Sequence, residues 1–251
     1  MRQFATAVAV ATTGLLLAAC GSSNGGGTAS TSSTTTTATA SKPPLAQAAL
    51  ANVLLTPAEI DSALGVTGSK SDKVIDQLNT DNPADLFPKG YKFPDECIYI
   101  TGTAEGSVYA GSGNIAVHGE RDSASIPGSD DPDPDVSQVV VLFPSAKEAN
   151  AFFTSSAQRW PACANRQDTV PGDADTPDIA WKVGPVSNTN GVLSTSTSVT
   201  ASRNGKGLSQ SCQRALTVRN NAVIDVEACR KDPANVAVDV ANQIAGKVDK
   251  Q

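Results

Sequence analysis

The order of apolar and polar residues along this chain predicts a few helices and several strands. Thr56-Pro57-Ala58-Glu59 combines an N-cap Thr, a proline at the first helical position and a Glu at the capping-box position. Gly65 follows where such a helix would end, because glycine adopts the left-handed conformation of a C-cap at little cost. The pattern predicts a short helix over residues 57–64.

Two later segments place apolar residues at helical spacing. In the first, residues 145–160, Ser145 is the expected N-cap and Glu148 follows at the capping-box position. A second helix is expected to begin at Asp232-Pro233 and to run near the end of the chain. The expected core-facing residues are Ala149, Phe152, Phe153, Ser156 and Trp160 in the first helix, and Val236, Val240, Ile244 and Val248 in the second.

Strands are expected mainly in the second half of the chain. Residues 139–143 are all apolar, which is typical of a strand covered on both faces. In contrast, the thirty or so residues after Gly65 are rich in Pro and Gly and are expected to wrap over the core, and residues 128–134 are expected to form an exposed acidic loop. The other expected strands are residues 115–119, 181–186, 192–200 and 208 onward.

These elements predict one α+β domain over residues 45–251. Helices stand at both ends of the segment, and the late strands follow one another without regular alternation with helices. Such an order is typical of an antiparallel β-sheet with flanking helices.

The first 44 residues have a different composition. Residues 1–19 carry Arg2 and then an uncharged apolar stretch from Phe4 to Leu17, the features of a bacterial export signal. Leu17-Ala18-Ala19-Cys20 resembles the lipobox of bacterial lipoproteins, which predicts lipidation of Cys20 and a membrane anchor; a plain cleaved signal peptide is the alternative. Residues 20–44 are rich in Ser, Thr, Gly and Pro and predict a disordered tether that could carry sugar.

Charge and composition exclude several kinds of function. Lys and Arg number 19 against 25 Asp and Glu, so the formal net charge is −6, the wrong sign for electrostatic binding to nucleic acid. Because Arg2 and Lys42 are the only charged residues before residue 45, the predicted domain carries 17 bases and 25 acids, a net of −8. One His and one Met leave few ligands for a metal or redox centre, and we expect no cofactor and no metal.

The four cysteines after Cys20 predict two disulfides in an exported chain. If Asn220-Asn221 is a two-residue hairpin turn, residues whose numbers sum to 441 face each other, and Cys212 and Cys229 satisfy this condition. The same register places Arg214 opposite Glu227 and Val218 opposite Val223, and it leaves Cys97 to pair with Cys163. A four-cysteine metal site is the alternative, but the spacings contain no C-x2-C pair.

Three segments carry a family resemblance: Trp160-Pro161-Ala162-Cys163, Trp181-Lys182-Val183-Gly184 and the hairpin from Cys212 to Cys229. From about residue 50 to 249 the sequence resembles the PknH-like extracellular domain of mycobacterial sensor kinases and lipoproteins. The resemblance implies a sensor-type module with an antiparallel sheet, two disulfides and a large cleft for a ligand. In the kinases the domain follows a transmembrane helix, whereas this sequence contains no kinase segment.

Few residues suggest catalysis. His118, the only imidazole, lies in an expected strand, and Gly111-Ser112-Gly113 lacks the spacing of a nucleophile elbow. Asp131-Pro132-Asp133-Pro134-Asp135 imitates half of a calcium loop, but Val136 and Leu142 stand where that loop needs Gly and Glu. The candidate ligand-binding residues are Tyr109, Arg121, Trp181 and Arg214, because aromatic and Arg side chains supply both apolar contact and donors in a cleft; Trp181 in the core and Arg214 paired with Glu227 or Asp225 are the alternatives.

Together these features predict a non-enzymatic cell-envelope lipoprotein whose sensor-like domain binds a small molecule, a glycolipid or other lipidic ligand, or a protein partner. The alternatives are a hydrolase or transferase that acts on the envelope, for which Glu105, Glu120 and Asp225 are carboxylates to test with His118, and a purely structural surface protein.

Overall fold

The computed structural model describes residues 42–251 apart from 89, 175 and 204–205. The predicted signal peptide, Cys20 and nearly all of the predicted tether therefore lie outside the described residues. Within the described part of the chain, no helix is long and apolar enough to cross a membrane.

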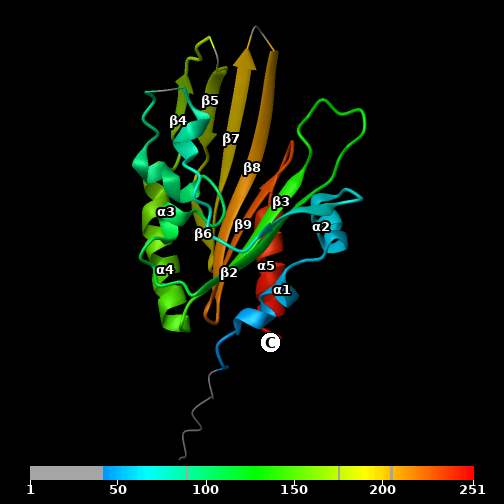
Figure 1. Ribbon diagram of the computed structural model, residues 1–251, viewed down its shortest axis with the longest axis vertical. Helices are drawn as coiled ribbons and strands as arrows, with labels where there is room; N and C mark the ends of the chain where they lie inside the picture. Colours follow the sequence, from blue (N-terminus) through cyan, green and yellow to red (C-terminus); the bar gives the residue numbers. More distant parts are fainter. Residues whose placement is uncertain (1–41, 89, 175, 204–205) are drawn as a thin grey trace, which may run out of the picture. The chain divides into compact units, whose positions relative to one another are not determined.

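The described residues form one nine-stranded antiparallel sheet, in the order β1-β2-β3-β9-β8-β7-β5-β4, with β6 paired to β7 (Figure 1). The predicted α+β fold with an antiparallel sheet and flanking helices is confirmed. The strands are β1 Lys70–Ile75, β2 Ala116–Ser123, β3 Asp135–Leu142, β4 Gln167–Val170, β5 Asp178–Val183, β6 Ser187–Thr189, β7 Val192–Arg203, β8 Lys206–Arg219 and β9 Ala222–Cys229.

Helices cover both faces of the sheet. Figure 1 shows α3 and α4 on one side of the strands and α1, α2 and α5 on the other. The α-helices are α1 Leu50–Val53, α2 Pro57–Leu64, α3 Gly106–Tyr109, α4 Ala146–Arg159 and α5 Val236–Val248. The 3₁₀ helices are η1 Gln47–Ala49, η2 Pro83–Leu86, η3 Asp95–Ile100 and η4 Trp160–Cys163.

The central strands feed two separate cores because successive side chains of a strand point to opposite faces. In β3, Val136 and Val140 pack in the core under α5, whereas Val139 and Val141 pack in the core under α4. All four are fully buried, which explains the uninterrupted apolar sequence of this strand. We call the two sides of the sheet the α5 face and the α4 face.

The α5 face is closed by the N-terminal helices and α5, and two side-chain amides hold the chain around α1. Gln138 accepts a hydrogen bond from the Leu55 backbone N–H (2.7 Å) and donates one to the Leu55 carbonyl (2.9 Å). Asn221 makes the same pair of bonds to Leu45 (2.7 and 3.2 Å). Each amide replaces a strand neighbour, so the polar backbone of this segment is satisfied although it is buried.

The helix predictions hold for α2 and α4 and need a correction for α5. Thr56 and Glu59 form the predicted capping box of α2, and Ser145 caps α4. The last helix, however, begins at Val236 instead of directly after Asp232-Pro233. Its first-turn N–H groups, at residues 237 and 238, donate to Oε1 of Gln213 on β8 (3.0 and 3.3 Å). A side chain distant in sequence therefore provides the cap, which local sequence signals cannot reveal.

Three strands were not expected. β1 lies in the segment expected to be only turns, and β4 and β6 are four and three residues long. Residues 70–74 of β1 are all exposed, so the strand has no buried face and no apolar alternation. Edge strands of this kind are specified by pairing with a neighbour, here β2, and leave little trace in the sequence.

The C-terminal hairpin has the predicted register. Asn220 adopts a left-handed conformation (φ 52°) in the turn, and Arg214 faces Glu227 across β8 and β9. Cys212 and Cys229 form a disulfide with their Cα atoms 4.0 Å apart, and Cys97 and Cys163 form the second (5.0 Å). The predicted pairing of the four cysteines is confirmed.

Candidate functional site

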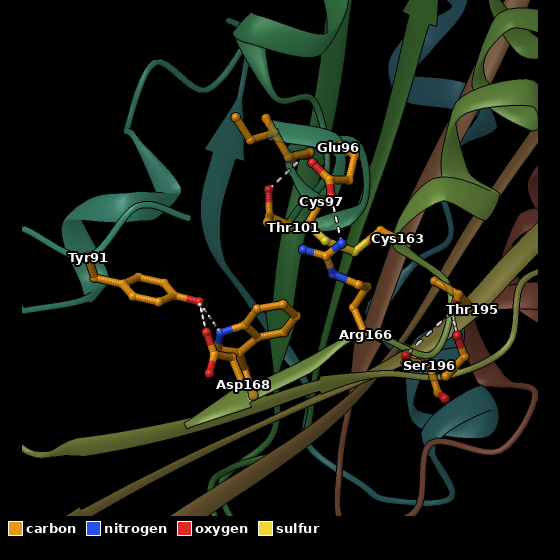
Figure 2. The surroundings of a disulfide bond; sticks show 12 residues. Tyr91, Glu96, Cys97, Thr101, Cys163, Arg166, Asp168, Thr195 and Ser196 are labelled. Atoms are coloured by element: carbon orange, nitrogen blue, oxygen red, sulfur yellow. Dashed lines mark hydrogen bonds and ion pairs between the residues drawn. A yellow bond between two sulfur atoms is a disulfide. The ribbon is translucent and has the colours of Figure 1, made fainter. Parts of the chain in front are cut away.

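Residues 76–109, between β1 and β2, cross the α4 face of the sheet; we call them the cover segment. Its middle is tied to the chain beyond α4 by the Cys97–Cys163 disulfide and by an ion pair between Glu96 and Arg166 (2.9 Å), which Figure 2 shows side by side. These links hold the cover segment at a fixed place over the sheet.

Tyr91 makes a third link between the cover segment and the sheet. Its hydroxyl donates to Asp168 on β4 (2.8 Å; Figure 2) and accepts from the indole N–H of Trp181 on β5 (3.0 Å). Phe87 and Phe93 of the cover segment lie beside these rings, with centroid distances of 4.8 Å from Phe87 to Tyr91 and 5.4 Å from Phe93 to Trp181. An aromatic cluster therefore joins the two layers.

A cleft of about 530 Å³ lies between the cover segment and strands β5 and β7. We call it the apolar cleft, because the rings of Trp181, Phe87 and Phe93 contribute to its wall. Its polar lining residues include carboxylates. Only 6% of Trp181 is exposed, so its ring forms a fixed wall. The lining residues include Asn79, Asp81, Asp85, Phe87, Phe93, Ile100, Glu105, Trp181, Lys182, Val183, Thr197 and Val199.

A second cleft, of about 600 Å³, adjoins the first over the other half of the sheet. We call it the polar cleft. Two residues of the cover segment, Asn79 and Glu105, line both clefts, so the two spaces meet at this pair. The charged residues that line the polar cleft are Lys73, Asp76, Glu105, Arg121 and Glu227.

Glu105 is held at this junction by backbone hydrogen bonds within the cover segment. The Asn79 N–H donates to the Ala104 carbonyl (2.8 Å), and the Gly106 N–H donates to the Asn79 carbonyl (2.7 Å). Oε1 of Glu105 accepts from the Asn79 side chain (3.0 Å), but the buried Oε2 has no hydrogen-bond partner among the described residues. Glu105 is only 5% exposed, and burial raises the pKa of its carboxyl.

Glu227 on β9 is a second carboxylate with a perturbed acidity. Its side chain lines the polar cleft, and its carboxylate has no hydrogen bond or ion pair with another described residue. Burial raises the pKa of its carboxyl to about 7, against the opposing effect of the Arg214 guanidinium. A carboxyl that titrates near neutral pH inside a cleft is a candidate for ligand contact.

Beneath the clefts lies a fully buried polar network. The Arg214 guanidinium is 2.6 Å from Oδ1 of Asp225, and both side chains are 2% exposed. Oδ2 of Asp225 accepts from the Tyr109 hydroxyl (3.0 Å) and from the Ala104 N–H (2.9 Å). The network fixes the backbone next to Glu105, because Ala104 is held in a left-handed conformation (φ 54°) that a non-glycine residue rarely adopts.

The four residues predicted to bind ligand therefore have two different positions. Trp181 lines the apolar cleft, and Arg121 lines the polar cleft, 44% exposed and paired with Asp135 (3.3 Å). Tyr109 and Arg214 instead belong to the buried network below the cleft floor. The Tyr109 hydroxyl and Nη1 of Arg214 contact Asp225, whereas Nε of Arg214 has no hydrogen-bond partner among the described residues. Of the two alternatives for Arg214, pairing with Glu227 or with Asp225, the structure has the pair with Asp225, and this cation does not reach the surface.

Two carboxylates of the clefts, Glu105 and Glu227, are not among the residues that the sequence predicts to bind ligand. The predicted register placed Glu227 opposite Arg214 as a charge pair; the structure has that register, but the ion pair of Arg214 is with Asp225. For Glu105 no sequence signal was available, because its burial depends on contacts with Asn79, far away in sequence.

The other motifs have ordinary contacts. Nδ1 of His118 lies 2.7 Å from the carboxylate of Asp76, which directly follows β1. No described hydrogen bond joins His118 to a hydroxyl or thiol. The aspartates of the acidic loop bind separate partners: Asp131 pairs with Lys231, Asp133 accepts from the Ile126 N–H, and Asp135 pairs with Arg121. The described contacts thus do not converge on a common ion site.

Comparison with known proteins gives consistent results. Over 208 residues the chain is 34% identical to the serine/threonine-protein kinase PknH of Mycobacterium bovis and, equally, to that of Mycobacterium tuberculosis. The matched part is 83% of this chain but 32% and 30% of these relatives, so the chain spans about a third of their length.

The structure is similar to the crystal structure of the extracellular domain of PknH from Mycobacterium tuberculosis, with a TM-score of 0.68 and 30% sequence identity. That match covers 83% of this chain and 99% of the other. Residues 45–247 also match the PknH-like extracellular domain as a family. This chain therefore belongs to the PknH-like extracellular domain family.

Proposed function

We propose that this protein is a non-enzymatic module of the cell envelope that binds a small ligand through its apolar cleft. One observation carries the proposal: a cleft of about 530 Å³ whose roof, the cover segment, is fixed in place. A disulfide and an ion pair tie this segment to the chain beyond α4, and an aromatic cluster ties it to β4 and β5. Its volume lies in the range of small-molecule sites, and such sites are usually preformed.

The rigidity of the cleft supports binding because a preformed site loses little conformational entropy when a ligand enters. Trp181 is fixed by its hydrogen bond to Tyr91, and Cys97 holds the cover segment nearby. An apolar wall with a few polar groups, here Asn79 and Glu105, is typical of sites that recognise one orientation of a ligand.

Ligand binding is tested by mass spectrometry of the full chain purified from its own membrane, with a variant that fills the cleft. Val199 lines the apolar cleft and is 45% exposed, so Val199→Trp adds bulk there without disturbing the core. Ile126, also 45% exposed, lies in the loop after β2 and gives a matched control, Ile126→Trp.

The proposal expects a small molecule to copurify with the wild-type protein and with Ile126→Trp but to be lost, or reduced about tenfold or more, in Val199→Trp. Equal recovery from all three proteins would place the molecule outside the apolar cleft and contradict the proposal. Recovery of a chemically altered molecule on incubation with purified protein would favour the alternative, an envelope hydrolase or transferase.

We also propose that a lipid on Cys20 anchors the domain to the outer surface of the cytoplasmic membrane. The support is the sequence Leu17-Ala18-Ala19-Cys20 after an apolar export signal. Cells fed an alkyne-tagged fatty acid are expected to label the wild-type chain, and Cys20→Ala is expected to lose the label. A label that survives in Cys20→Ala would exclude this anchor, whereas the binding proposal would stand.

A further inference from the structure

The junction of the two clefts indicates what kind of ligand the domain accepts. We infer that the ligand is an organic amine, whose ammonium group binds the Glu105 carboxylate at the junction while its apolar part lies in the apolar cleft. This inference rests on the proposed function, because it assigns a chemical class to the ligand of that same site.

The first argument is the unsatisfied oxygen of Glu105. Oε1 receives the Asn79 amide, whereas Oε2 is buried and receives no donor from the described residues. A carboxylate oxygen accepts hydrogen bonds, so the missing partner is a donor, and an ammonium group supplies donors together with a compensating charge. A buried acceptor without a partner destabilises the folded protein, and a correctly placed donor would remove that cost.

The second argument is the sign of the charge around the junction. The two arginines nearby each have a carboxylate partner: Arg121 pairs with Asp135 (3.3 Å) and Nη1 of Arg214 with Asp225 (2.6 Å). The Arg214 charge also acts on Glu105, and its Nε has no hydrogen-bond partner among the described residues. Among the other charged residues that line the clefts, carboxylates outnumber lysines, so the electrostatic potential there favours a cation. The carboxylates that line the two clefts are Asp76, Asp81, Asp85, Glu105 and Glu227, of which Asp76 contacts His118, and the lysines are Lys73 and Lys182.

The third argument separates an organic amine from a metal ion. The apolar cleft next to Glu105 contains the rings of Phe87, Phe93 and Trp181, which offer no ligand atoms to a hard cation. These rings do favour alkyl or ring carbons, and their faces attract an ammonium group by cation–π interaction. A molecule with both a carbon skeleton and a positive charge uses the two kinds of surface at once.

The test compares three probes of equal length on the full chain in lipid nanodiscs at pH 8: hexylammonium, hexanol and hexanoate. Isothermal titration calorimetry measures each affinity, with empty nanodiscs subtracted. We expect hexylammonium to bind about 10- to 100-fold more tightly than hexanol, the ratio that a charge-assisted hydrogen bond provides, and hexanoate to bind most weakly. This comparison needs no variant and so does not depend on the folding of one.

Glu105→Gln, which keeps the size of the side chain, then locates the effect. The variant is expected to reduce the affinity for hexylammonium to that for hexanol. Asp130→Asn is the matched control, because it removes one negative charge from the exposed acidic loop away from both clefts. If Asp130→Asn lowered the amine affinity as much as Glu105→Gln, general attraction by the acidic protein would explain the binding and the inference would fail.

The failures of the two proposals look different. If hexanol or hexanoate binds as tightly as hexylammonium and Val199→Trp weakens that binding, the apolar cleft is a ligand site but the amine inference is wrong. If none of the probes binds and no molecule copurifies with the wild-type protein, the proposed function itself fails. Tight binding of hexylammonium that both Val199→Trp and Glu105→Gln weaken supports both.

Discussion

The two faces of the sheet bury polar groups in different ways. On the α5 face the buried polar groups that cross between layers are mainly neutral amides, Gln138, Asn221 and Gln213. They bond to the backbone of residues that flank the N-terminal helices or lie in the first turn of α5. On the α4 face the buried groups are ionisable, and they include Arg214 and Asp225 at 2% exposure. The exception on the α5 face is Asp122: Oδ2 of its carboxylate accepts from Gln138, whereas Oδ1 has no hydrogen-bond partner among the described residues.

This difference separates support from a candidate site. A neutral side-chain amide that replaces a strand neighbour pairs with the buried backbone N–H and carbonyl groups, and it leaves no charged group available to a ligand. An ionised group in a low-dielectric interior is costly unless it is fully paired, and the α4 face leaves one Glu105 oxygen without a donor and Glu227 without a partner among the described residues. Both clefts that contain these carboxylates lie on this face, under the cover segment.

The largest expected effect comes from breaking the buried ion pair. Asp225→Ala leaves the Arg214 charge buried without a carboxylate and is expected to lower the free energy of unfolding by about 3–5 kcal/mol. The loss in the free energy of unfolding is measured by urea unfolding with circular dichroism as the signal. A loss below about 1 kcal/mol would show that Arg214 reaches water in the native state, so that the network beneath the clefts is not fully buried.

The next effect concerns the disulfide that holds the cover segment. Cys97→Ser with Cys163→Ser opens a link between residues 66 apart and is expected to cost about 4 kcal/mol in the chain-entropy account. Thermal unfolding gives the loss, and probe titration of the folded fraction gives the effect on binding. Because the cover segment forms the roof of the apolar cleft, binding is expected to weaken as well; unchanged affinity would show that the other links suffice.

A third prediction uses the acidity of Glu227. Its pKa is about 7 in the folded protein and near 4.5 when unfolded, so between these values the folded state keeps a proton that the unfolded state has released. Stability from this group is therefore lost as pH rises from about 4.5 to 7. Glu227→Gln is expected to remove this loss and to raise the free energy of unfolding at pH 8 by about 2 kcal/mol.

The experiment for Glu227 is urea unfolding of both proteins from pH 5 to pH 8, with Asp130→Asn as the control for one lost charge. Parallel pH profiles for wild type and Glu227→Gln would contradict the assignment. The charged groups that act on Glu227 are Arg214, Asp135, Asp225 and Glu105, with Arg121 also within range.

The smallest expected effect lies on the α5 face. Gln213→Ala removes the acceptor for two N–H groups in the first turn of α5 and is expected to cost about 1 kcal/mol, similar to the loss of a local N-cap. Unfolding in urea measures the loss, and probe binding on the other face is expected to stay unchanged. A change in affinity would show that the two faces are coupled through β8.

Local sequence rules accounted for the features whose causes are local. The capping box of α2 and the N-cap of α4 need only neighbours three residues apart, and the C-terminal hairpin needs only its turn and the two strands around it. The register of that hairpin then gave one disulfide directly and the second by elimination. The start of α5 was misplaced because its cap is Gln213, from another element.

What the sequence determined by itself was therefore the type of fold, the cysteine pairing and most helix and strand positions, because periodicity, caps and turns act between near neighbours. The tertiary structure alone decided which polar residues are engaged and which are left open. Arg214 and Tyr109 were expected in a cleft, yet both are bound to Asp225 beneath it, by an ion pair and by a hydrogen bond. Glu105 instead lies between two clefts, and its Oε2 has no hydrogen-bond partner among the described residues. Burial and charge pairing depend on segments far apart in the chain, and only folding brings these together.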